Sequence, residues 1–188
     1  MWVRPRTASS SAGRQTHPFR PALPFSARTV RYTGAMSNFC YEYPRPAFTC
    51  DAAVFAGPAD ARKVLLVKRG AEPFAGCWAL PGGFVDEDER PMDAARRELA
   101  EETGLVWEGE MVPLGPFGDP GRDPRGWTVT AVYIADIGLA TPLVVGADDA
   151  VEARWCFADD LPEKMAFDHV EIIAAALRSL GRLSEERA

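Results

Sequence analysis

The sequence predicts an α/β protein of the α+β kind, with helices flanking a mixed β-sheet. Three observations support this. The chain contains short runs of apolar, β-branched and aromatic residues, and two longer segments with helical periodicity. Their order is three strands, a helix, two strands, one more strand and a second helix, which is typical of a sheet covered by helices.

The length and charge of the chain predict one folded domain preceded by a basic tail. The 188 residues contain 47% hydrophobic and 26% charged residues, enough apolar side chains for a core. Residues 1–41 carry six Arg and neither Lys nor acidic residues, so removing their charge of +6 from the net charge of −6 leaves −12 for residues 42–188. We therefore expect a disordered extension at 1–41 and a domain at 42–188. An acidic domain disfavours a nucleic-acid partner, although local arginines and metal ions can still bind a small polyanion.

The basic tail resembles an organelle transit peptide in its many Arg and Ser residues, but its prolines argue against an amphipathic helix. We favour Met36 as the true start, with the upstream stretch unstructured or spurious. The four cysteines have no metal-binding spacing, and no apolar run is long enough for a membrane span. We therefore expect a reduced, cytoplasmic protein without membrane association.

Three strands are predicted before the first helix: Ala47–Phe55, Lys63–Lys68 and a short segment at Trp78–Leu80. Gly57 and Pro58 mark the turn after the first strand, and the run Pro81-Gly82-Gly83 is interpreted as another turn.

The first helix is predicted at residues 90–103. Pro91 suits its first turn and Gly104 is a natural stop. The residues expected on its core face, at helical spacing, are Met92, Ala95, Leu99 and Thr103.

Beyond this helix, Leu105–Phe117 and Trp127–Ile137 are predicted strands joined by the loop Gly118–Gly126. A short strand is expected at Ala153–Phe157. The second helix is expected at Asp168–Leu180, with Ile172, Ile173, Ala176 and Leu180 on its apolar face.

Three carboxylates gather on the first helix. At about 100° per residue, Glu98, Glu101 and Glu102 share one arc of the helix surface. Carboxylates so close repel one another unless a multivalent cation neutralises them. Hard oxygen ligands suit Mg²⁺ or Mn²⁺ better than zinc.

These carboxylates belong to a longer motif that resembles the Nudix box, G-x5-E-x7-R-E-U-x-E-E-x-G-U. Every specified position is filled, by Gly83, Glu89, Arg97, Glu98, Leu99, Glu101, Glu102, Gly104 and Leu105. Tyr43–Pro46, Gly76–Gly82 and Phe167–His169 also look like one subgroup of this family, so the resemblance covers about residues 42–180. The full motif outweighs the alternative that these charges only decorate a solvated helix face.

The resemblance implies an α-β-α sandwich that hydrolyses a nucleoside diphosphate linked to another group, using Mg²⁺ or Mn²⁺. Metal ions neutralise the diphosphate and activate the attacking water. By similarity, Glu98 and Glu102 bridge metals, and Glu101 and the Gly83 carbonyl supply further ligands. Glu89 and Arg97 resemble residues that orient these carboxylates.

The loop Gly118–Gly126 resembles that of the small ADP-ribose pyrophosphatases, and Pro120 falls near a Pro associated with them. Arg122 and Arg125 are therefore candidate phosphate ligands; the alternative is that they pair with Asp119 and Asp123 on the surface. We expect cleavage of ADP-ribose to AMP and ribose 5-phosphate.

Two rival functions remain open. One is the same chemistry on another nucleotide, such as an oxidised dNTP, NADH or a sugar nucleotide; the pattern SQPWPFPxS of NADH-cleaving relatives is absent. The other is a non-catalytic module that senses ADP-ribose. The intact motif and the eight residues after Leu180 favour an enzyme, and relatives suggest a homodimer.

Residues outside the motif complete the predicted site. Among Asp148, Asp149 and Glu152, Glu152 is our candidate general base, with a plain acidic loop as the alternative. Candidate adenine-stacking or core aromatics are Phe48, Phe84 and Tyr133. His169 is expected to cap or orient the second helix.

Overall fold

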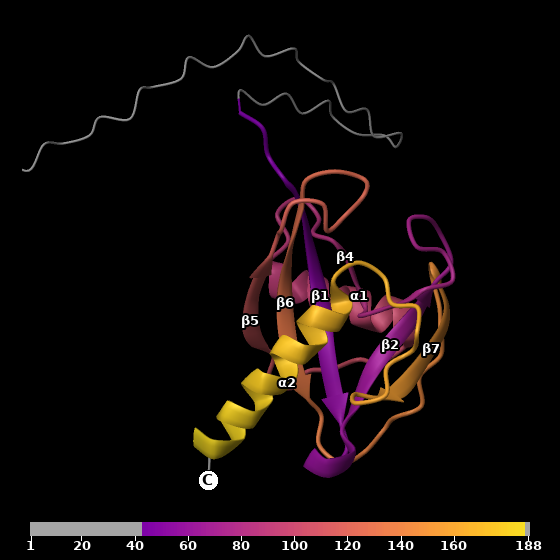
Figure 1. Cartoon of the computed structure of the whole chain (residues 1–188), viewed down its shortest axis with the longest axis vertical. Helices are drawn as coiled ribbons and strands as arrows, with labels where there is room; N and C mark the ends of the chain where they lie inside the picture. Colours follow the sequence, from indigo (N-terminus) through magenta and orange to yellow (C-terminus); the bar gives the residue numbers. More distant parts are fainter. Residues whose placement is uncertain (1–42, 187–188) are drawn as a thin grey trace, which may run out of the picture. The chain divides into compact units, whose positions relative to one another are not determined.

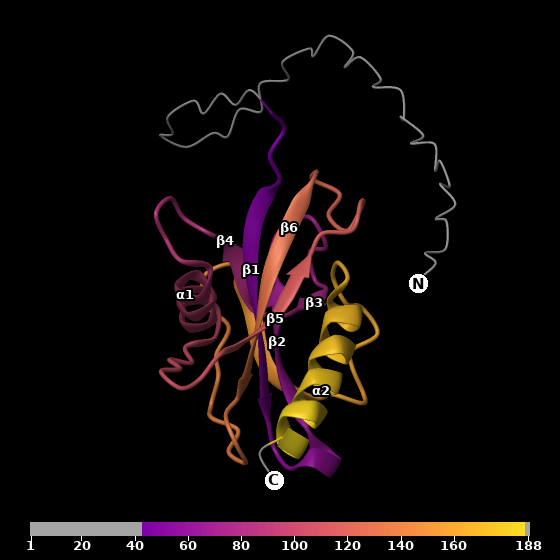
Figure 2. The same cartoon turned by 90° about the vertical axis from the view of Figure 1, so that its left-hand side faces the viewer.

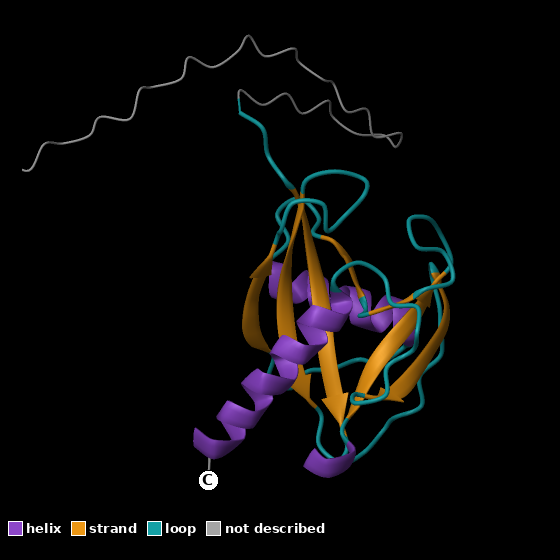
Figure 3. Cartoon of the chain, viewed as in Figure 1, coloured by secondary structure: helices purple, strands orange, loops and turns teal. Residues whose placement is uncertain are grey.

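The computed structural model describes residues 43–186, so the predictions about residues 1–41 and Met36 lie outside the described residues. The described part forms a seven-stranded mixed sheet with two α-helices and a short 3₁₀ helix (Figure 3). In chain order the elements are β1 (Ala47–Ala56), η1 (Ala59–Ala61), β2 (Lys63–Arg69), β3 (Trp78–Ala79), β4 (Gly82–Phe84), α1 (Pro91–Thr103), β5 (Val112–Phe117), β6 (Thr128–Asp136), β7 (Ala150–Phe157) and α2 (His169–Glu186).

The sheet is organised around β1, whose flanking neighbours run in opposite senses. β1 pairs with β6 in parallel from Ala47 to Phe55, and with β2 in antiparallel fashion. The strand order is β3-β2-β1-β6-β5, with β4 added to β1 and β7 added to β2. β5 lies at the edge, where Pro113 and Pro116 cost few ladder hydrogen bonds.

β1 and β2 diverge a short distance from the turn that joins them (Figure 1). They pair only at Phe55↔Val64 and Ala56↔Lys63. Beyond that point β2 pairs with β3, and β1 pairs with β4. The chain from β3 to β4 therefore crosses from one branch of the sheet to the other, and it carries the glycines of the motif across the opening.

The two helices cover opposite faces of the sheet (Figure 2). β1 is buried on both faces, and successive residues alternate between two cores. Ala52 and Val54 pack in the cluster that contains Leu99 of α1, while Phe55 packs in the cluster that contains Ile172 of α2. The expected mixed sheet between helices is confirmed.

α1 agrees closely with the prediction. It begins at Pro91 and ends at Gly104, which has φ of 71° in the left-handed region that glycine tolerates. Ala95, Leu99 and Thr103 are fully buried as expected, and Met92 packs at the edge of the same core.

Four predicted boundaries were wrong. Only Val112–Phe117 of the range Leu105–Phe117 is a strand, because residues 105–111 turn back on themselves and Trp107 donates a hydrogen bond to the Glu110 carbonyl at 3.1 Å. The glycines of the expected turn form β4, held by pairing with β1. β7 begins at Ala150, and α2 continues to Glu186. Within residues 43–186, neither helix is long and apolar enough to cross a bilayer.

Candidate active site

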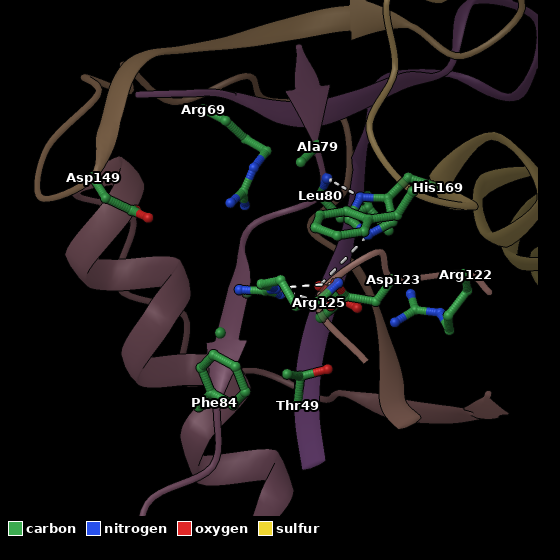
Figure 4. A pocket seen from close by; sticks show the side chains of 14 residues that line it. Thr49, Arg69, Ala79, Leu80, Phe84, Arg122, Asp123, Arg125, Asp149 and His169 are labelled. Carbon is green, nitrogen blue, oxygen red and sulfur yellow. Dashed lines mark hydrogen bonds and ion pairs between the residues drawn. The ribbon is translucent and has the colours of Figure 1, made fainter. Parts of the chain in front are cut away.

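A cavity opens in the sheet where β1 and β2 diverge (Figure 4). Its walls come from β1, the end of β2, the segment from β3 to β4, the loop Gly118–Gly126 that carries Arg122 and Arg125, and the residues at the starts of β7 and α2. The lining residues are Thr49, Asp51, Arg69, Ala79, Leu80, Gly82, Gly83, Phe84, Arg122, Asp123, Arg125, Asp149, Phe167 and His169.

The two glycines of β4 fit between side chains of β1 and α1. A Cβ on Gly82 would collide with the Cys50 carbonyl and with Asp51, and a Cβ on Gly83 would collide with the Glu98 carboxylate. The Gly82 N–H also donates to Glu102 Oε2 at 2.9 Å. The absence of side chains on β4 therefore lets the acidic face of α1 approach the sheet.

Glu102 is buried rather than solvated, since its residue is only 5% exposed. Burial, a hydrogen bond with Asp149 and the charges of Asp149 and Glu98 raise the pKa of Glu102 to about 9. Burial likewise raises the pKa of Glu98. The charged form of Glu102 is therefore costly in this environment, and a cation beside it would stabilise that form.

Arg97 holds the other carboxylates of the motif in place. Its guanidinium donates to Glu89 at 2.9 Å, to Glu98 at 2.8 Å and to Glu101 at 3.0 Å. A further N–H reaches the Phe84 carbonyl at 3.1 Å. Arg97 lowers the pKa of Glu89 to about 2. Neither Arg97 nor Glu89 lines the cavity, which suits a role in orientation.

The carboxylates beside β4 have the chemistry that a hard divalent cation requires, but they do not yet have the spacing. Within residues 43–186, no group of three acidic, His or Cys side chains is already spaced to hold a metal ion. Glu98 is held by Arg97, and burial and the neighbouring Asp149 raise the pKa of Glu102. Cation binding would favour the charged form of Glu102 and would compete with Arg97 for Glu98. The side chain of Glu101 is 47% exposed, forms an ion pair with Arg97 and does not line the cavity.

The two candidate phosphate ligands both lie at the cavity, and both are paired with carboxylates. Arg122 is nearly buried and makes a bidentate contact with Asp168, at 2.9 and 2.6 Å, instead of pairing with Asp119. Arg125 pairs with Asp123, as expected from the alternative to phosphate binding. Its guanidinium also lies 5.3 Å from the Phe84 ring centroid. Arg125 is therefore placed by an ion pair and an aromatic ring together.

The structure does not bring Glu152 to the cavity. In β7 it lies opposite Lys68 of β2, 3.9 Å from its ammonium group. Asp149, three residues earlier and before the strand, lines the cavity instead (Figure 4). Among the candidate aromatics, Phe84 lines the cavity, Tyr133 packs in the α1 core, and Phe48 is 40% exposed elsewhere.

His169 fixes the start of α2, as expected. The backbone N–H of Leu80 donates to His169 Nδ1 at 2.9 Å, which joins the first residue of α2 to the β3–β4 segment. His169 is buried, and burial lowers its pKa. The ring therefore acts as a neutral acceptor at this contact.

Three lining residues were missed by the sequence interpretation: Asp51, Arg69 and Phe167. Asp51 had a signal, because it is a charged residue inside an otherwise apolar strand. Arg69 ends β2 and donates to the Pro73 carbonyl at 2.8 Å, and its guanidinium lies 5.2 Å from the Phe167 ring centroid. In Figure 4 Arg69 extends between Asp149 and His169.

This fold and this acidic helix are those of a known hydrolase family. The family model described as "NUDIX domain" matches residues 50–176. The chain therefore belongs to the Nudix family, and the predicted resemblance is confirmed.

Individual relatives narrow the comparison. The chain is 42% identical over 136 residues to the ADP-ribose pyrophosphatase of Methanocaldococcus jannaschii, covering 72% of this chain and 76% of that protein. It is 34% identical over 142 residues to the ADPR responsive transcriptional repressor NtrR of Acinetobacter baylyi, covering 74% of this chain but 56% of the repressor.

Solved structures agree with this placement. The NUDIX domain of Shewanella oneidensis NrtR, complexed with ADP ribose, has a TM-score of 0.67 and 34% identity, covering 73% of this chain and 90% of that chain. A Francisella tularensis bifunctional NMN adenylyltransferase/ADP ribose pyrophosphatase, complexed with AMP and a Mn ion, has a TM-score of 0.64 and 29% identity, covering 74% of this chain and 43% of that chain.

The two glycines of β4 should respond differently to substitution. Gly82→Ala forces a Cβ against backbone atoms of Cys50 and Asp51, so we expect a loss of about 1–3 kcal/mol in the free energy of unfolding. Gly83→Ala meets only the end of the Glu98 side chain, so the fold should survive. Displacement of Glu98 should then lower turnover at least about tenfold.

Chemical denaturation and a metal-dependent turnover assay measure both effects. Gly181→Ala is the control, because a Cβ there meets open space on α2. Equal loss of stability in Gly82→Ala and Gly83→Ala would contradict the separate roles.

His169 should make stability fall on the acid side. Its folded pKa is below the ordinary value of 6.5, so the unfolded chain binds a proton that the folded chain refuses. Its contribution is thus present above pH 6.5 and is lost as the pH falls toward the folded pKa, by up to about 1.4 kcal/mol per pH unit. His169→Asn keeps an acceptor for Leu80 but cannot titrate.

The measurement is the free energy of unfolding of both proteins between pH 8 and pH 5. The advantage of wild type over His169→Asn should shrink as the pH falls, while groups common to both cancel. A constant difference across this range would show that folding does not shift the pKa of His169, which would contradict the prediction.

Proposed function

We propose that this Nudix domain is a Mg²⁺-dependent pyrophosphohydrolase that cleaves ADP-ribose to AMP and ribose 5-phosphate. One observation carries the proposal: a single cavity is lined both by the β4 glycines, against which Glu98 and Glu102 lie, and by arginines and aromatic rings. The similarity to an archaeal ADP-ribose pyrophosphatase supports the same substrate. A compact diphosphate with a sugar or base on each side requires both parts of such a cavity.

The carboxylates on α1 set the chemistry. A bound divalent cation would offset the diphosphate charge and lower the pKa of a water molecule. Glu98 and Glu102 lie beside β4, where they would hold it with the Gly83 carbonyl. Arg97 restrains Glu98 through its ion pair, which reduces the reorganisation needed for binding. Glu101 remains a candidate ligand that would have to turn from Arg97.

Asp149 is better placed than Glu152 to take the proton from the attacking water. It lines the cavity, and it lies close enough to Glu102 to raise the pKa of that carboxyl group. In the hydrolysis, the water oxygen bonds to phosphorus, the P–O bond to the leaving phosphate breaks, and the water proton passes to a base. Glu152 is separated from this position by its place in β7 beside Lys68.

The arginines on the other wall favour an anionic substrate with a planar group. Arg125 is 41% exposed at its side chain, and its guanidinium also lies 5.8 Å from the Phe167 ring centroid. Arg69 lies 5.2 Å from the same ring centroid. Guanidinium groups match phosphate oxygens, so both arginines could contact a phosphate, although Arg125 would have to release Asp123, whose side chain is only 1% exposed.

A second candidate function is that of an ADP-ribose sensor, which the similarity to the NtrR repressor favours. Binding alone does not distinguish the two functions, because both require the cavity. Multiple turnover does, because a sensor releases ADP-ribose unchanged.

The deciding experiment incubates the purified full chain with Mg²⁺ and a panel of substrates: ADP-ribose, NADH, ADP-glucose and 8-oxo-dGTP. We expect release of AMP from ADP-ribose with the highest kcat/KM of the panel. Turnover of another compound alone would overturn the substrate, and tight binding of ADP-ribose without turnover would favour the sensor.

Glu102→Gln should abolish most activity and preserve the fold. Loss of the charge should lower kcat by about 100-fold or more. The folded pKa of Glu102, about 9, exceeds the ordinary 4.5, so the native charge costs stability as the pH rises between these values. In EDTA at pH 8, Glu102→Gln should therefore be at least as stable as wild type by thermal denaturation.

Glu108→Gln, an exposed change on the loop after α1, is the matched control and should alter neither quantity. Near-normal rates for Glu102→Gln would refute its metal-binding role.

Replacing Arg122 or Arg125 by Ala should lower stability, because each change leaves a carboxylate without its ion-pair partner. Arg122→Ala affects Asp168 and Arg125→Ala affects the buried Asp123, so we expect a loss of about 1–3 kcal/mol in the free energy of unfolding for each. Arg125→Ala should also raise KM for ADP-ribose severalfold if Arg125 binds phosphate. An unchanged KM would reduce Arg125 to the ion-pair partner of Asp123.

A further inference from the structure

Asp51 is an unusual residue for its position. It lies in the middle of β1, between residues that are fully buried, and is itself only 7% exposed. Thr130 Oγ1 of β6 donates to Asp51 Oδ2 at 2.6 Å. Burial of a carboxylate is costly unless both oxygens are satisfied, and this bond satisfies one of them. The other oxygen, Oδ1, lies against Gly82 at the cavity.

His169 presents a complementary donor to the same space. Because its Nδ1 accepts the Leu80 N–H, the ring proton of the neutral imidazole resides on Nε2. Nε2 is 3.9 Å from Asp51 Oδ1, which is too long for a direct hydrogen bond (dashed line in Figure 4). Within residues 43–186, no closer acceptor for Nε2 is found. Burial also lowers the pKa of His169, so no strong ion pair closes this space.

A donor and an acceptor at this separation suit one hydroxyl group. An oxygen about 2.8 Å from each atom can accept from Nε2 and donate to Oδ1 at the same time. A phosphate oxygen has no proton to donate and would be repelled by the Asp51 carboxylate. A nucleobase edge carries its donor and its acceptor on different atoms. It would therefore need two parallel hydrogen bonds, whereas the hydrogen bonds to Nε2 and Oδ1 converge on one ligand atom.

We propose that Asp51 and His169 together form a binding site for a sugar hydroxyl of the substrate. The site selects a sugar at this end of the cavity, whereas the carboxylates at β4 act on the diphosphate. Arg122 and Arg125 are engaged by Asp168 and Asp123, so they do not neutralise Asp51 by direct pairing. The inference rests on the proposed function in one respect, that the substrate carries a sugar. Both the adenosine ribose and the terminal ribose meet this condition.

Product binding tests the site without relying on turnover. Ligand-observed NMR would give the Kd of AMP, ribose 5-phosphate and inorganic pyrophosphate for the full-length wild type and for Asp51→Asn. The Asn side chain matches Asp in shape, and its oxygen can still accept the hydrogen bond from Thr130. It has no charged second oxygen to accept a hydrogen bond from the sugar hydroxyl. We expect about 10- to 100-fold weaker binding of the product whose hydroxyl occupies the site. Pyrophosphate, which lacks a hydroxyl, should bind within about twofold of wild type.

The affected product identifies the source of the hydroxyl. A loss confined to AMP places the adenosine ribose there, and a loss confined to ribose 5-phosphate places the terminal ribose there. Unchanged binding of both would overturn the proposal, as would equal weakening of all three ligands, which indicates a structural role. Asp136→Asn is the matched control, because Asp136 pairs with Arg62 at 2.8 Å outside the cavity.

A second variant keeps the test independent of folding and of the substrate assignment. His169→Asn retains an acceptor for Leu80 but lacks the Nε2 donor, so it should show the same selective loss. Thermal denaturation identifies any variant that fails to fold, and the other then decides. Failure of wild type to hydrolyse ADP-ribose would overturn the proposed function alone, because the binding series still measures the hydroxyl site.

Discussion

The close approach of β4 to both β1 and α1 is the constraint on which the rest of the site depends. Gly82 and Gly83 have no side chains, so Asp51 and Glu98 can lie against them from opposite sides. The Gly82 N–H also donates to Glu102, which brings a buried carboxylate to the same strand. A side chain at Gly82 would push β1 away, and one at Gly83 would displace the Glu98 carboxylate. The acidic face of α1 and the Asp51 carboxylate are thus set on two sides of one short strand.

Such an arrangement concentrates acidic groups, and the protein offsets them in different ways. Arg97 compensates Glu89, Glu98 and Glu101 through one guanidinium, whereas burial and the neighbouring Asp149 and Glu98 raise the pKa of Glu102. The first device is permanent, because Arg does not lose its charge. Glu102 has no such partner, so its charged form is the costly one.

Some features were predictable because they depend on local spacing. The bounds of α1 follow from Pro91 and Gly104, and its buried face follows from helical periodicity around Leu99. β4 was misread, because two consecutive glycines also have the composition of a turn. Glu152 was preferred over Asp149 for a related reason. Both are acidic and close in sequence, and only the pairing of Glu152 with Lys68 in the sheet turns it from the cavity.

The sequence by itself determined the family and the acidic helix, because these reside in residues a fixed number of positions apart on one element. The tertiary structure alone decided which distant groups meet: Arg122 with Asp168, and Asp51 with His169. Those contacts depend on how the sheet divides between β1 and β2 and on where α2 is docked by the Leu80 hydrogen bond. No local spacing encodes them, because each is the outcome of long-range strand pairing and helix packing.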